Sequence, residues 1–304
     1  LKFIHHALKK EIGDEVSMKD IHAGKYSEQI SKYTVTTATD GNHGRSVAFG
    51  AKLFGCKCQI YIHSEVSSGR QKAMEDLEAT VNRVSGNYDE SLQICIEDAG
   101  KNNWYVISDT SYEGYTKYPR YIMAGYNVMA EEIIDQIKDR PLPTHVFLQG
   151  GVGSFPGAIC GYFWEKFPGN NIKFVVVESE HAPCLIRSAQ NNQMTSVNIK
   201  QETMMAGLSC GEPSLLGWEI LKSGADDFIT INDSSIPGLM RLLAENNLKI
   251  EAGESSVAGL AGLIESMEDQ KIAEAMELNK ESIVLLFGTE GATDPDIYRS
   301  IISE

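Results

Sequence analysis

Short apolar runs alternate with segments of helical spacing along most of the chain. Phe174–Val177 is an unbroken apolar run and Ser31–Ala38 is rich in β-branched residues, so both are typical of strands. Between such runs, apolar residues recur at helical spacing, as they do from Tyr88 to Ala99. This alternation predicts an α/β fold with open, mostly parallel sheets and helices on both faces. The predicted strands are residues 31–38, 58–62, 80–84, 104–107, 145–148, 174–177 and 282–287.

The proline-bearing stretch Asp139–Pro143 is typical of a connection between domains. We therefore expect a smaller α/β domain over residues 1–138 and a larger one over residues 139–304. Leu1–Ile12 has the spacing of a helix but no start signal before it. We expect that a further N-terminal part of the protein precedes Leu1.

The amino-acid composition and net charge of the chain limit the kinds of molecule that it is expected to bind. The chain has 304 residues with 42% hydrophobic and 23% charged residues, which is typical of a globular protein with a core. Its net charge of −15 repels nucleic-acid phosphates, and no apolar run is long enough to span a membrane. Six cysteines are too few for a disulfide scaffold, and Cys56 and Cys58 have no second pair with which to bind zinc. We therefore expect a cytoplasmic protein with a small-molecule partner and no metal site.

A glycine-rich loop, Gln149–Gly157, follows one predicted strand and precedes a helix. Glycines in this position let the backbone approach an anion and direct several N–H groups toward it, so the loop favours a phosphate ligand. A tight turn without a ligand is the alternative. The dinucleotide pattern is not matched, because Pro156 stands where that pattern has its last glycine.

Two further motifs follow predicted strands. In Thr39–Gly44, glycines flank Asn42 and His43, so that Asn42 is placed to donate to a ligand; helix capping by Asp40 or Asn42 is the alternative. In Gly288–Asp294, the Thr289 hydroxyl is placed to meet a ring nitrogen, and a plain turn is the alternative. Ligands of open α/β sheets bind at these strand ends.

Together the three motifs resemble the fold type II pyridoxal-phosphate enzymes, whose fold is that of the tryptophan synthase β-subunit. Asp40 stands where most members have a small residue, and the block Thr39–Gly44 is similar to that of the diaminopropionate ammonia-lyases. Further blocks share this similarity, and the resemblance runs from about Thr34 onward. These blocks are residues 109–117, 205–213, 217–221, 253–255 and 289–294.

The resemblance implies pyridoxal 5′-phosphate as cofactor and the conversion of 2,3-diaminopropionate, in its L and D forms, to pyruvate and ammonia. It implies that Asp40 and Asp109 are catalytic acids, with Asp40 serving the D form. It places Asn42 beside the ring oxygen and Thr289 at the ring nitrogen, where a neutral hydroxyl leaves that nitrogen unprotonated. The implied phosphate-binding residues are Gly150, Gly151, Val152, Gly153 and Ser154, and the implied substrate-binding residues are Thr39, Tyr115, Lys117 and Gly207.

The family's Schiff-base lysine has no match in this sequence, and its spacing predicts that it precedes Leu1. Lys2, Lys32 and Lys117 do not fit the role. The alternatives are a threonine or serine dehydratase, a non-catalytic relative that binds the cofactor, and, more distantly, a nucleotide-dependent dehydrogenase. The resemblance also implies a homodimer, and Cys184 and Cys210 are candidates for a disulfide.

Overall fold

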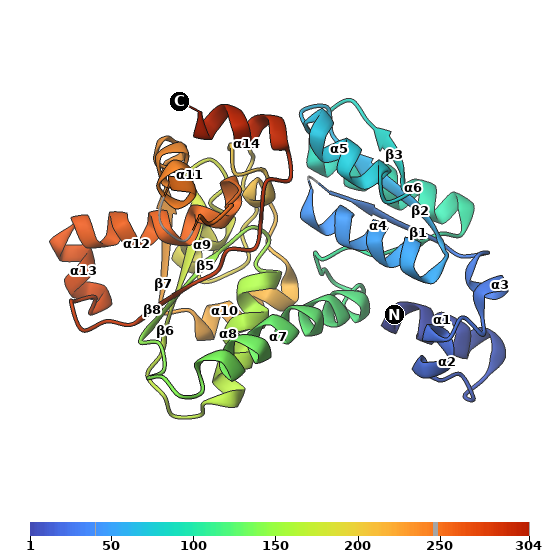
Figure 1. Cartoon of the computed structure of the whole chain (residues 1–304), viewed down its shortest axis with the longest axis horizontal. Helices are drawn as coiled ribbons and strands as arrows, with labels where there is room; N and C mark the ends of the chain where they lie inside the picture. The colour runs from blue at the N-terminus through green and yellow to red at the C-terminus, as the bar shows by residue number, and fades with distance from the viewer. Residues whose placement is uncertain (40, 246–248, 304) are drawn as a thin grey trace. The chain divides into compact units, whose positions relative to one another are not determined.

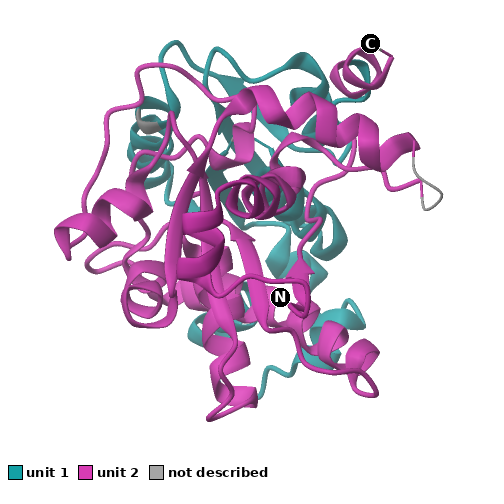
Figure 2. Ribbon diagram, turned by 90° about the vertical axis from the view of Figure 1, so that its left-hand side faces the viewer, with its two compact units in different colours: residues 1–108, 293–296 teal, residues 109–292, 297–304 magenta. Residues whose placement is uncertain are grey.

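The computed structural model describes residues 1–39, 41–245 and 249–303 and forms two compact units, coloured separately in Figure 2. Unit 1 comprises Leu1–Ser108 and Thr293–Asp296, and unit 2 comprises Asp109–Ala292 and Ile297–Glu304. Asp40, one of the predicted catalytic residues, lies outside the described residues. No helix in the described part of the chain is long and apolar enough to cross a membrane.

Unit 1 is built on a four-stranded parallel sheet with the strand order β3-β2-β1-β4. The strands are β1 (Thr34–Ala38), β2 (Lys57–Ile62), β3 (Thr80–Arg83) and β4 (Tyr105–Val106). The helices that accompany them are α1 (Lys2–Ile12), α2 (Met18–His22), α3 (Ser27–Ile30), α4 (Asn42–Phe54), α5 (Ser68–Glu75) and α6 (Tyr88–Asn102).

Unit 2 repeats this plan with a parallel sheet of order β7-β6-β5-β8. Its strands are β5 (His145–Gln149), β6 (Lys173–Ser179), β7 (Asp227–Ile231) and β8 (Val284–Leu286). The helices up to β7 are α7 (Lys117–Ile137), α8 (Ser154–Lys166), α9 (Cys184–Asn191), η1 (Ala206–Leu208) and α10 (Leu215–Gly224). The later ones are η2 (Asp233–Ser235), α11 (Ile236–Glu245), η3 (Glu254–Val257), α12 (Ala258–Glu268), α13 (Gln270–Met276) and α14 (Pro295–Ile302).

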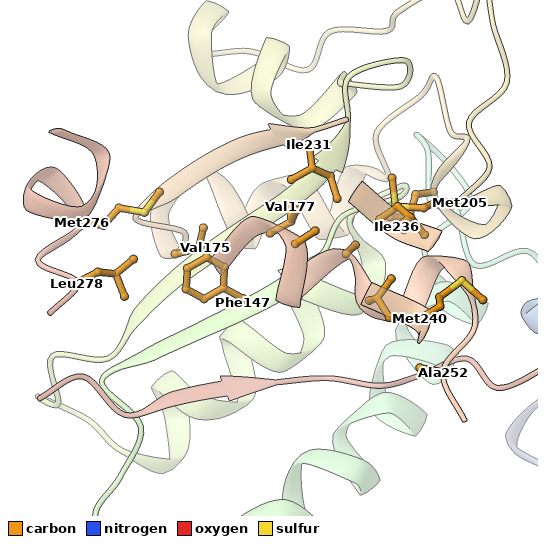
Figure 3. Packing of buried hydrophobic residues seen from close by; sticks show 14 of the residues in the cluster. Phe147, Val175, Val177, Met205, Ile231, Ile236, Met240, Ala252, Met276 and Leu278 are labelled. Atoms are coloured by element: carbon orange, nitrogen blue, oxygen red, sulfur yellow. The ribbon is translucent and has the colours of Figure 1, made fainter. Parts of the chain in front are cut away.

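The central strands of unit 2 are apolar on both faces because each face packs against helices. Phe147 and Val175 belong to a core that α11, α12 and α13 cover, which Figure 3 shows from close by. Their neighbours Val146 and Val176 point the other way, into a core shared with α7, α8 and α10. Figure 1 accordingly shows α12 along one face of this sheet and α8 and α10 along the other. Successive side chains of a strand point to opposite faces, which explains the unbroken apolar runs.

The predicted α/β class and parallel sheets are confirmed, and each predicted strand corresponds to an observed one. The edge strand β7 was not predicted. The expected division between residues 138 and 139 differs from the structure, in which the units divide between Ser108 and Asp109. The physical reason is that α7 buries Ala130 and Ile134 in the core of unit 2, so this helix belongs to that unit.

Candidate active site

Each sheet has one point at which the strand order reverses, between β1 and β4 in unit 1 and between β5 and β8 in unit 2. Ligands of open α/β sheets bind in the crevice beyond the carboxyl ends of the strands at such a point. The motif at Thr39–Gly44 follows β1, the glycine-rich loop follows β5, and the Thr289 motif follows β8. All three predicted motifs therefore lie at the switch point of their own unit.

The glycine-rich loop of unit 2 has the backbone of an anion cradle. Gly151 and Gly153 have φ angles of 56° and 92°, which an L side chain rarely adopts, and a Cβ at Gly151 would lie 3.3 Å from the carbonyl oxygen of Gly207. Gly153 is the N-cap of α8, and no side chain caps this helix. The positive end of the α8 dipole therefore faces the loop, where it favours a negative ligand.

The N–H groups of the loop divide into two sets. Gly150 donates to the carbonyl oxygen of Val177 at 2.8 Å, and Gly153 donates to the carbonyl oxygen of Gly150 at 3.1 Å. Among the described residues, the N–H groups of Gly151, Val152 and Ser154 have no acceptor within the chain. Within the loop, Gly150 and Gly153 thus donate to backbone carbonyls, and the N–H groups of Gly151, Val152 and Ser154 remain open.

Thr289 is exposed and lies against the end of β5. The side-chain amide of Gln149 donates to Thr289 Oγ1 at 2.8 Å, because β5 and β8 are neighbours in the sheet. Next to Thr289, the carboxylate of Glu290 accepts from the N–H of Ser255 at 2.8 Å. Ser255 Oγ in turn accepts from the N–H of Gly207 at 3.2 Å. Thr289 and the predicted substrate-binding Gly207 are thus brought to the glycine-rich loop within unit 2.

Three buried serines connect Asp109 to the same loop. The Ser154 hydroxyl donates to the carbonyl oxygen of Asp109 at 2.7 Å and lies 2.9 Å from Ser214 Oγ. Ser214 Oγ accepts from the N–H of Ser111 at 2.9 Å and lies 2.8 Å from Ser111 Oγ. The N–H of Ser214 donates to the carbonyl oxygen of Val152 at 2.7 Å. The backbone of Asp109 is therefore held against the loop by what we call the serine cluster, Ser111, Ser154 and Ser214.

Two ionisable groups near this loop have shifted pKa values. Burial, and secondly the negative charge of Asp109, raise the pKa of Tyr126 above its usual range, so this phenol stays neutral. Burial raises the pKa of Glu178 to about 7, although its carboxylate accepts from the N–H groups of Leu185 and Ile186 at 2.8 and 2.7 Å. Glu178 thereby caps α9, whose first residue, Cys184, donates its thiol to the carbonyl oxygen of Gly151 at 3.6 Å.

In unit 1, Thr39 rather than Asn42 organises the start of α4. Thr39 Oγ1 accepts from the N–H groups of Gly41 and Gly44, both at 3.1 Å, and its side chain is buried. Asn42 makes no cap and is exposed. His43 Nε2 lies 2.7 Å from the carbonyl oxygen of Ile107 and, since a carbonyl only accepts, carries the proton. The motif after β1 is thus tied to the end of β4.

The predicted substrate-binding residues Tyr115 and Lys117 lie on the turn before α7 and at its first residue. The Tyr112 and Tyr115 rings stack at 5.1 Å, and their backbones pair across the turn. Lys117 is exposed. In the described part of the chain, no group of three or more His, Cys, Asp or Glu side chains is placed to hold a metal ion, and none of the six cysteines, Cys184 and Cys210 included, is joined in a disulfide.

The residues of unit 2 fit a phosphorylated aromatic cofactor. Three open N–H groups at a helix N-terminus match a phosphate, and an exposed hydroxyl at the adjacent strand end matches a ring nitrogen. A family model described as pyridoxal-phosphate-dependent enzyme matches residues 16–288. The chain belongs to this family. Within the pyridoxal-phosphate-dependent enzymes, the open donors of Gly151, Val152 and Ser154 are those that would hold the phosphate.

Several members of the family are similar over most of their length. Diaminopropionate ammonia-lyase of Escherichia coli K12 is 38% identical over 281 residues, which cover 90% of this chain and 70% of that protein. The enzyme of the same name from Salmonella typhimurium LT2 is 35% identical, over 99% of this chain and 77% of its own. A crystal structure of the E. coli enzyme with an aminoacrylate–pyridoxal-phosphate azomethine intermediate superposes with a TM-score of 0.84. It is 35% identical, over 93% of this chain and 78% of that one.

Sequence reasoning missed the side chains that support the site. The motifs alone give Gln149 no role, although a polar residue that ends an apolar strand is a signal for one. The serine cluster gave no signal, because Ser214 lies 103 residues from Ser111 and 60 from Ser154. The hydrogen bonds that Glu178 accepts from the N–H groups at the start of α9 could not be predicted from the spacing of residues in the sequence.

Proposed function

We propose that the protein is a lyase that converts 2,3-diaminopropionate and water to pyruvate and two molecules of ammonia. The observation that carries the proposal is the convergence, at the switch point of unit 2, of three open N–H donors and the exposed Thr289 hydroxyl. The substrate is proposed from the similarity to the diaminopropionate ammonia-lyases. Pyridoxal phosphate, when bound, supplies an electron sink that makes the α-proton of an amino acid easier to remove.

The residues of this chain are given roles by their contacts and by the family resemblance. We assign phosphate binding to the N–H groups of Gly151, Val152 and Ser154, assisted by the α8 dipole. Asp109, whose backbone the serine cluster holds beside these donors, is proposed to attract the second, cationic amine of the substrate. Gly207 is proposed to line the substrate space, because its carbonyl oxygen lies beside Gly151.

Other roles are proposed from the resemblance. Asn42 is proposed to bind the ring oxygen of the cofactor, which its exposed side chain permits. Asp40 is proposed to exchange the α-proton of the D substrate. We propose that the substrate is bound by Thr39, Tyr115 and Lys117. Thr39 would act indirectly, through the start of α4, whose N–H groups it accepts from.

We further propose a cytoplasmic homodimer that degrades amino acids. Cysteines that form no disulfide suit a reducing compartment.

The test is a comparison of substrates with the purified full-length gene product and pyridoxal phosphate. We expect kcat/KM for forming pyruvate from L-diaminopropionate to exceed kcat/KM for the deamination of L-serine and of L-threonine. The reverse order would contradict the proposal and favour a dehydratase. Failure to turn over diaminopropionate despite bound cofactor would also contradict it and would favour a non-catalytic relative. Sedimentation of the same protein tests the dimer.

A further inference from the structure

Gln149 is a buried residue at the switch point of unit 2, and only 5% of it is exposed. Its Nε2 donates to the carbonyl oxygen of Phe287 at 3.0 Å and to Thr289 Oγ1 at 2.8 Å. Within the described residues, its Oε1 is buried without a hydrogen-bond partner. Leaving a buried acceptor unpaired is unfavourable, so the two bonds made by Nε2 are retained at the expense of Oε1.

The orientation of this amide follows from its neighbours. A carbonyl oxygen only accepts, so the NH₂ group and not Oε1 must face Phe287. The second N–H of the same group then points to Thr289 Oγ1. Thr289 has one hydroxyl proton, and that proton cannot point at a group that is itself donating. The Thr289 hydroxyl is therefore an acceptor toward Gln149 and a donor toward the open side, where Thr289 is exposed.

We propose that Gln149 is a positioning residue that fixes Thr289 as a hydrogen-bond donor toward the ring nitrogen of the cofactor. A nitrogen that receives a hydrogen bond from a neutral hydroxyl stays an acceptor and is itself unprotonated. Gln149 thus helps to set the electronic state of the ring, although it does not touch the cofactor. The inference rests on the proposed function, because that function places the ring nitrogen at Thr289.

Substitution of Gln149 by glutamate discriminates this role from simple packing, because the two side chains have nearly the same shape. An ionised carboxylate at this position has only acceptors. A protonated carboxyl would place its hydroxyl oxygen where Nε2 lies, donate its one proton to the carbonyl oxygen of Phe287, and present only a lone pair of that oxygen to Thr289 Oγ1. In both states Thr289 would donate to the carboxyl group and turn a lone pair to the ring. Gln149→Glu should therefore favour a protonated ring nitrogen. Gln149→Met removes the donors and leaves the hydroxyl free to rotate.

The experiment is ¹⁵N NMR of the full-length gene product loaded with pyridoxal phosphate that carries ¹⁵N in the ring. For the wild type we expect the chemical shift of an unprotonated ring nitrogen across neutral pH. Gln149→Glu should move the signal toward that of the protonated ring, and Gln149→Met should make it dependent on pH. Thr289→Val should abolish the wild-type chemical shift of the ring nitrogen, and Thr289→Ser should retain it. Ser188→Ala, a buried serine of α9, is the control and should leave the signal unchanged.

Wild-type signals in Gln149→Met and Gln149→Glu, together with a changed signal in Thr289→Val, would overturn the inference. If Gln149→Glu does not fold, the comparison of Gln149→Met with Thr289→Val decides the matter alone. The proposed function fails separately: in that case the wild type does not bind the cofactor or does not consume diaminopropionate. Cofactor binding and turnover with unchanged signals in the Gln149 variants refute the role of Gln149 only.

Discussion

Ser214 is the centre of the serine cluster and is fully buried. Replacing it by alanine leaves the N–H of Ser111 without its acceptor, at a cost of about 1–3 kcal/mol, and breaks the link to Ser154. Because Ser214 anchors Ser111, two residues from Asp109, and supports the Ser154 hydroxyl that donates to Asp109, we expect Ser214→Ala to lower kcat in addition to stability. Urea unfolding and steady-state kinetics measure the two effects.

Ser188→Ala is the matched control for this substitution. Ser188 is equally buried and accepts from the N–H of Thr195 at 2.9 Å, so its removal should cost a similar free energy of unfolding. It lies outside the serine cluster, and kcat should therefore be retained. An equal loss of kcat in the two variants would show that the serine cluster only stabilises the fold.

Asp40 and Asp109 are expected to differ in which substrate isomer depends on them. Asp40→Asn should reduce kcat for D-diaminopropionate by about 10²–10⁴-fold, the usual contribution of a general base, and affect the L isomer much less. Asp109→Asn should weaken the binding of both isomers, because the second amine that Asp109 attracts is common to them. Separate rate measurements with each isomer decide this. A uniform loss in Asp40→Asn would assign Asp40 to binding.

At the scale of residues, the motifs that follow strands were predictable and their supporting side chains were not. Glycines beside Asn42, and a hydroxyl after an apolar strand, are local patterns that a single sequence displays. The bonds of Gln149 to Phe287 and Thr289 join residues 138 and 140 positions apart. Only the sheet, which makes β5 and β8 neighbours, brings these residues together.

The burial of Glu178, the residue that caps α9, makes the stability of unit 2 depend on pH. Burial raises the pKa of Glu178 from 4.5 to about 7, so between these values the folded state holds a proton that the unfolded state has released. Stability should therefore fall as pH rises through this window, by at most about 3 kcal/mol, and this contribution should level off above it. Unfolding by urea at a series of pH values measures the slope.

Glu178→Gln should remove this component of the slope. Glu165→Gln changes an exposed carboxyl on α8 and should leave the slope as it is in the wild type. If Glu178→Gln retained the full dependence between pH 4.5 and about 7, burial of Glu178 would not be its source.

At the scale of elements, the spacing of apolar residues predicted where strands and helices form, but not which of these elements pack against each other. The strands β5 and β6, whose central residues are apolar, were predicted, because burial on both faces demands such apolar runs. The edge strand β7 is only half-buried for most of its length and gave a weaker signal. The apolar stripe of α7 indicates that this helix packs against another element. It does not indicate that the partner is α8 of unit 2 and not an element of unit 1.

For the whole molecule, the acidic charge and the glycine-rich loop lead to opposite expectations about anions. A net charge of −15 disfavours general binding of phosphate, so binding must come from the local donors of the loop. Pyridoxal phosphate at 100 times its Kd should therefore stabilise the protein by about 2.7 kcal/mol. Pyridoxal, which lacks the phosphate, should raise Tm much less at the same concentration. Equal shifts would contradict the assignment of the loop.

The central claim is that the loop after β5 binds the phosphate of pyridoxal phosphate while Thr289 meets its ring nitrogen. A crystal structure of the full-length gene product with this cofactor tests it most directly. We predict the phosphate on the N–H groups of Gly151, Val152 and Ser154, and the ring nitrogen within hydrogen-bond distance of Thr289 Oγ1. Cofactor bound away from these groups, or a different ligand held by them, would contradict the claim.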